Sequence, residues 1–96
     1  AACFEVNISY RGGNPPLKML DKLIKQPWFT ANQIKAEDYL KTDLYDFYIT
    51  MHTYSYKVEK LTEDEQEHLK GSLEEIEQAL DEKYGEYADY EVNITE

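Results

Sequence analysis

The side chains of this chain that are suited to acid–base, nucleophilic or metal chemistry are two histidines, one cysteine, nine tyrosines and twenty carboxylates. His52 lies in a run of tyrosines, so an enzyme acting on a cationic or neutral metabolite would use His52 as acid–base group and Tyr54 or Tyr56 to orient the substrate. No conspicuous histidine and carboxylate accompany Cys3 in the sequence, as the activation of a cysteine nucleophile would require. We therefore predict no catalytic residue, and a small enzyme stays the alternative to a binding protein.

Metal and cofactor chemistry is weakly supported. His68 follows Asp64 and Glu65 at helical spacing, a pattern that is more typical of a surface ion pair than of a metal site. A single cysteine excludes an intramolecular disulfide and any cluster built on several cysteines of one chain. We predict no metal and no cofactor, and because a free cysteine suits a reducing compartment, we expect a cytoplasmic protein.

The negative charge is concentrated in the second part of the chain. The net charge is −10, yet residues 1–58 carry a net +1 and residues 59–96 a net −11. Such a balance disfavours direct binding to nucleic acid or to an anionic membrane. No apolar run approaches the roughly 18–20 residues that cross a bilayer. We therefore expect a protein partner with a basic surface.

The elements that would position these groups follow from hydrophobic periodicity. Alternation of apolar and polar residues predicts four strands, which cover residues 3–10, 30–38, 44–59 and 89–95. The segment 28–43 is ambiguous, because Thr30 could instead cap a short helix carrying Ile34 and Leu40; we favour the strand.

Two helices are predicted, over residues 16–26 and 62–84. Asn14 is placed to cap the first helix, and Pro27 ends it. Thr62 and Glu65 form a capping box at the start of the second.

This order of elements predicts one α+β domain over residues 1–96. The economical arrangement is a ferredoxin-like βαββαβ plait, an antiparallel sheet with both helices on one face, with the first and third strands at its centre. A three-stranded α+β sheet with two helices is the fallback. Within the strand over 44–59 we expect Phe47, Ile49 and Met51 to face the helices.

The open face of that sheet would then carry an aromatic row. Its members share one face of the predicted third strand and are Tyr48, His52, Tyr54 and Tyr56. Rows of this kind resemble the stacking platforms of single-stranded nucleic-acid binders, but those need surrounding lysines and arginines. Here the flanking strands offer Glu5 and Glu91, so a protein interface is the favoured interpretation.

The second helix adds an acidic surface that would bind the same partner. Its candidate contact residues are the carboxylates Glu67, Glu74, Glu75, Glu77, Asp81 and Glu82. In composition the chain resembles phage-encoded inhibitors of restriction and CRISPR effectors, which are small, acidic and contain tyrosines. The resemblance implies a non-enzymatic inhibitor that occludes a nucleic-acid-binding enzyme by mimicking DNA. A homodimer through stacked sheet faces is a further alternative.

Overall fold

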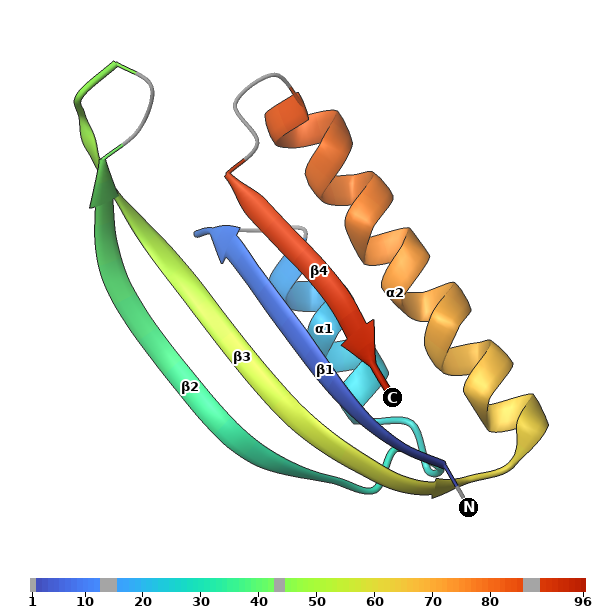
Figure 1. The fold of residues 1–96 in the computed structure, drawn as a ribbon. Helices are drawn as coiled ribbons and strands as arrows, with labels where there is room; N and C mark the ends of the chain where they lie inside the picture. The colour runs from blue at the N-terminus through green and yellow to red at the C-terminus, as the bar shows by residue number, and fades with distance from the viewer. Residues whose placement is uncertain (1, 13–15, 43–44, 86–88) are drawn as a thin grey trace.

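The alternating segment at the start of the chain forms β1, one of the central strands of a four-stranded antiparallel sheet. The computed structural model describes residues 2–12, 16–42, 45–85 and 89–96. The strands are β1 (Ala2–Arg11), β2 (Ala31–Thr42), β3 (Tyr48–Leu61) and β4 (Tyr90–Thr95), in the spatial order β2-β3-β1-β4. The expected central position of the first and third strands is thus confirmed, and the ambiguous segment is a strand rather than a helix (Figure 1).

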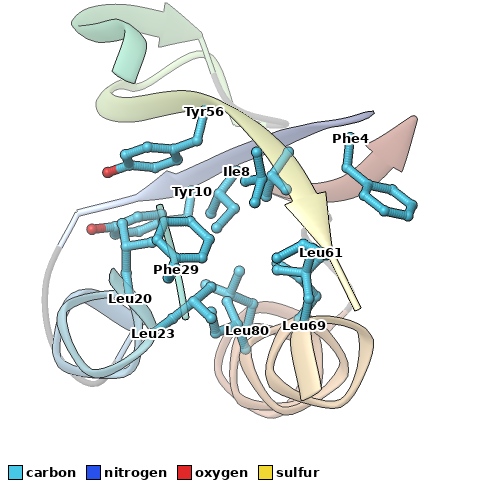
Figure 2. Packing of buried hydrophobic residues seen from close by; sticks show 14 of the residues in the cluster. Phe4, Ile8, Tyr10, Leu20, Leu23, Phe29, Tyr56, Leu61, Leu69 and Leu80 are labelled. Atoms are coloured by element: carbon cyan, nitrogen blue, oxygen red, sulfur yellow. The ribbon is translucent and has the colours of Figure 1, made fainter. Parts of the chain in front are cut away.

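Two helices, α1 (Pro16–Ile24) and α2 (Glu63–Tyr84), lie together on one side of the sheet (Figures 1 and 2). Pro16 occupies the first position of α1, where its missing N–H costs nothing. The predicted cap Asn14 lies outside the described residues. At α2 the capping box is confirmed: the Glu65 amide donates to the Thr62 hydroxyl at 3.2 Å, and the Thr62 amide donates to the Glu65 carboxylate at 3.1 Å.

The core lies between the sheet and the helices (Figure 2). Its residues from β1 are Phe4, Val6, Ile8 and Tyr10, which alternate along the strand, and those from α2 form an apolar stripe, Leu69, Leu73, Ile76 and Leu80. Leu20 and Leu23 of α1 also belong to it, together with residues of β3 and Phe29. Removing this apolar surface from water is the main source of stability.

The expected orientation of β3 is wrong. Tyr56 lies opposite Val6 of β1, and Val58 lies opposite Phe4, so both share the helix-facing side of the sheet. Tyr56 is 7% exposed and packs edge-on against Phe29 at 5.8 Å between ring centres. The tyrosine set thus faces the helices, and the set containing Ile49 and Met51 faces the other way.

A local irregularity near the end of β3 keeps a further leucine in the core. The pairing with β1 shifts between Ala2 and Cys3, which leaves Lys60 as an extra residue with a left-handed φ of 60°. A bulge of this kind exchanges the faces beyond it. Leu61 therefore turns toward the helices and is buried, although alternation from Val58 would have pointed Lys60 there.

Ile49 and Met51 are nevertheless buried, on the face of the sheet opposite the helices. The register places Lys41 beside Ile49 and Arg11 beside Met51 on that same face. Both cations converge on the buried carboxylate of Asp89, at 3.6 Å from Arg11 and 3.7 Å from Lys41. The stems of these long side chains help to cover the two apolar residues while their charged ends meet Asp89.

Among the described residues, no helix is long and apolar enough to cross a membrane.

Candidate functional site

One flank of α2 is a row of carboxylates beside β4. Steps of three and four residues bring side chains to one side of a helix. Such steps align one lysine and five acids on this flank, namely Glu63, Glu67, Lys70, Glu74, Glu77 and Asp81. All six are exposed. We call this set the acidic flank; four of the predicted contact residues lie in it.

Lys70 offsets only part of the negative charge of the acidic flank, which holds five carboxylates. Among the described residues, the side-chain ion pairs join groups of the sheet and Asp89, and none uses a carboxylate of α2. Glu74 with Glu77, and Glu77 with Asp81, are like-charged neighbours one helical turn apart, an arrangement that disfavours the helix by a few tenths of a kcal/mol per pair. A stabilising surface would alternate the signs.

Between α2 and β4 the acidic flank borders a shallow groove of about 350 Å³, lined by Glu74, Glu77, Gln78, Asp81 and Tyr90. The Tyr90 hydroxyl donates to Asp81 Oδ1 at 2.9 Å. This hydrogen bond, followed by partial desolvation and the charges of Asp81 and Glu77, raises the pKa of Tyr90 above its ordinary value. The groove therefore combines negative potential with an aromatic wall, which suits a lysine or arginine side chain.

The other two predicted carboxylates, Glu75 and Glu82, lie on the opposite flank of α2. Glu75 borders a groove of about 410 Å³ between the two helices, which is also lined by Met19, Lys22, Leu23, Gln26, Trp28, His68 and Ser72. His68 lies beside Trp28, with 6.2 Å between ring centres. No group of three or more potential metal ligands occurs among the described residues.

The predicted aromatic row does not form one exposed surface. Tyr56 is buried, Tyr54 is half-buried against the core with its ring stacked on Tyr10, and His52 is half-buried. Only Tyr48 is fully exposed, at 75%. The alternation Ser55-Tyr56-Lys57-Val58-Glu59 is the signal that could have revealed this, because its polar members share a face with Ile49 and Met51.

His52 is held by contacts with three neighbouring segments, although it was expected in an exposed row. Its Nδ1 lies 2.6 Å from Asp38 Oδ1 of the neighbouring strand, and its ring centre lies 5.7 Å from that of Tyr10. Gly12 approaches so closely that a Cβ atom there would lie 2.5 Å from His52 Nε2. His52 pairs with Tyr10, so its imidazole is on the helix-facing side of the sheet and not on the open face.

The open face carries a polar ladder instead of aromatic rings. The Ser55 hydroxyl donates to Asn7 Oδ1 at 2.6 Å, Asn7 donates to Asn93 at 3.2 Å, and Asn93 donates to Glu91 at 2.6 Å. Three strands are thus linked across this face by side-chain hydrogen bonds.

Sequence reasoning missed an exposed apolar arm. β1 pairs with β3 only as far as Met51, so β2 and β3 continue beyond β1 as a two-stranded ribbon over residues 40–42 and 48–50 (Figure 1). We call this ribbon, together with residues 45–47, the hairpin arm. This hairpin arm carries the exposed side chains Leu40, Tyr45, Phe47 and Tyr48. Leu40 lies opposite Thr50 and Tyr48 opposite Thr42, so both point to the same face. The unusual length of the strand over 44–59 was the available signal.

No protein-family model, no curated protein and no solved structure matches this chain. The function must therefore be argued from the surfaces themselves.

Proposed function

We propose that this chain is a non-enzymatic protein-binding module that recognises a basic surface on its partner. The most specific form of the proposal is an inhibitor, phage-encoded and acting in the cytoplasm, that occludes a nucleic-acid-binding enzyme. The observation that carries it is the acidic flank of α2, whose carboxylates are exposed and have no cationic partner among the described ion pairs. The exposed free thiol of Cys3 supports a reducing compartment.

The dimensions of the acidic flank support mimicry of a nucleic-acid backbone. From Glu63 to Asp81 the helix rises about 27 Å at ~1.5 Å per residue. That is the length of roughly eight base pairs at ~3.4 Å each. A groove that tracks a short duplex would therefore meet negative charge along a comparable distance.

Aromatic anchors for the complex come from the hairpin arm. Tyr48 keeps its proposed contact role, and Tyr45, Phe47 and Leu40 replace the two tyrosines that lie within or against the core. Large aromatic side chains dominate binding energy because they bury much area at a small entropic cost. In this arrangement the carboxylates speed association and the arm slows dissociation.

For the scaffold we infer a ferredoxin-like βαββαβ plait. The strand order β2-β3-β1-β4 and the position of both helices on one face support this finer assignment. In such a plait the edge strands β2 and β4 can contact a partner protein, and α2 lies beside β4 with its acidic flank facing outward.

The test compares the wild-type protein with Glu74→Lys combined with Glu77→Lys. Both are immobilised, and binding of purified DNA-binding enzymes with basic grooves is measured at 50 and 300 mM salt, with and without a competing DNA duplex. For a partner we expect an association rate at least tenfold lower at high salt, and a similar loss in the double variant at low salt. The duplex should compete with the wild-type protein.

A matched control keeps the charge change but moves it. Glu59→Lys with Glu96→Lys alters the same number of exposed carboxylates away from the acidic flank and should bind nearly as the wild type does. Equal association rates for the Glu74/Glu77 variant and the wild type would overturn the proposal. Binding that the duplex leaves unchanged would overturn the mimicry.

A further inference from the structure

β2 is a long edge strand of the sheet, and no described element covers its outer side. It stands at the end of the strand order, and eleven of its twelve residues are exposed. Among the described strands only β3 pairs with it, so its outer edge offers unused backbone donors and acceptors. Edges of this length are usually blunted by charged side chains, a proline, a bulge or a covering element. β2 has charged side chains of both signs, so a second strand can pair with it only in a register that sets opposite charges against each other. Here the one irregularity lies between Gln33 and Lys35, and the pairing from Lys35 to Thr42 is regular.

The charge distribution leaves this edge neutral in a strongly acidic molecule. β2 carries two bases and two acids, Lys35, Lys41, Glu37 and Asp38. The acidic flank of α2 lies beside β4, at the opposite edge of the sheet (Figure 1). Two molecules that meet through β2 therefore keep their acidic helices at the far ends of the assembly, where repulsion between them is weak.

We propose that β2 pairs with β2 of a second copy of this chain, antiparallel and about a two-fold axis at Tyr39, so that two four-stranded sheets form one continuous sheet. This axis places Glu37 opposite the copy's Lys41 twice, and Tyr39 opposite its own copy. An axis at Asp38 would instead set Lys35 against Lys41 and Asp38 against itself. An axis at Ala36 would use the irregular stretch near Lys35.

The side chains at this edge fit such a contact. Tyr39 is 43% exposed and Leu40 is 68% exposed, so pairing removes apolar surface from water on both faces of the strand. In the single molecule the Lys41 ammonium lies 3.7 Å from Asp89, and the Glu37 carboxylate lies 3.1 Å from Lys35. Both side chains are exposed, and in the dimer they turn outward and pair with each other across the two-fold axis. The interface is isologous, because each contact occurs twice around the axis.

The test measures the mass in solution by sedimentation over a range of concentrations. The wild type should show a concentration-dependent dimer. Glu37→Lys should weaken dimerisation about tenfold or more, since two attractive cross-strand pairs become repulsive. Lys41→Glu should do the same, and the combination of Glu37→Lys with Lys41→Glu should restore the dimer because the pairs are again of opposite sign.

Glu91→Lys is the matched control, with the same charge change on β4 at the other edge of the sheet, and it should leave the dimer intact. A monomer at every concentration would overturn the proposal. So would a dimer that survives Glu37→Lys, or a double variant that stays monomeric while retaining the wild-type circular dichroism spectrum. None of these results depends on whether the acidic flank binds a partner.

Discussion

Two tyrosines of the same strand, Tyr56 and Tyr48, should respond to truncation in opposite ways. Both were assigned to one exposed row by alternation, yet Tyr56 is 7% exposed and Tyr48 is 75% exposed. Tyr56→Ala removes a ring that packs against Phe29 in the core. Tyr48→Ala removes a ring that stands mostly in solvent on the hairpin arm.

The cost of Tyr56→Ala follows from the buried area. Burying a tyrosine removes roughly 150–250 Å² from water. At about 25 cal/mol per Å² this corresponds to roughly 4–6 kcal/mol as an upper bound, since unfolded chains already bury part of that area. We therefore expect Tyr56→Ala to lower the free energy of unfolding by about 3–5 kcal/mol. Tyr48→Ala should change it by less than about 0.5 kcal/mol.

Urea unfolding followed by far-ultraviolet circular dichroism measures both values. Tyr56→Phe serves as the control, because it keeps the ring and removes only the hydroxyl. Equal losses for Tyr56→Ala and Tyr48→Ala would refute the packing described above. Small and equal losses would restore the orientation that alternation first predicted, in which both rings are exposed.

Three further perturbations test the packing around the sheet. Burial, followed by the neighbouring Tyr54, raises the pKa of Tyr10, and burial likewise raises the pKa of Tyr56. Because these tyrosines ionise first in the unfolded chain, the free energy of unfolding should fall above about pH 10, by up to ~1.4 kcal/mol per pH unit for each group. Urea midpoints between pH 9 and 11 measure this fall, and a flat profile would contradict it. Gly12→Ala should lower the free energy of unfolding by about 1–2 kcal/mol, because the new Cβ displaces the imidazole of His52. In a double-mutant cycle followed by thermal unfolding, this loss should disappear in the His52→Ala background. Additive losses would exclude the clash. Lys60→Gly should raise the free energy of unfolding by about 0.5–1 kcal/mol by relieving a left-handed φ, and a loss of stability in urea titration would show that the bulge is not strained.

The sequence alone was sufficient for the elements and their order except over residues 28–43, where it left a strand and a short helix open. Local physics explains this: the capping box at Thr62 and Glu65 acts within one turn, and the stripe of α2 is a periodicity of one helix. The central position of β1 and β3 followed from the handedness of crossover connections. Helical spacing also aligns the carboxylates of the acidic flank, but the predicted contact set mixed four of them with Glu75 and Glu82 of the opposite flank.

The orientation of β3 was decided only by the tertiary structure. Alternation sorts its residues into two sets but leaves open which set meets the helices, and both sets contain apolar side chains. Pairing with β1 settled the choice, because a ring at position 56 lies opposite Val6, whose own face is buried. Ile49 and Met51 are nevertheless buried, because Arg11 and Lys41 reach across the face opposite the helices to Asp89. That contact joins three segments distant in the chain, and no local pattern contains it.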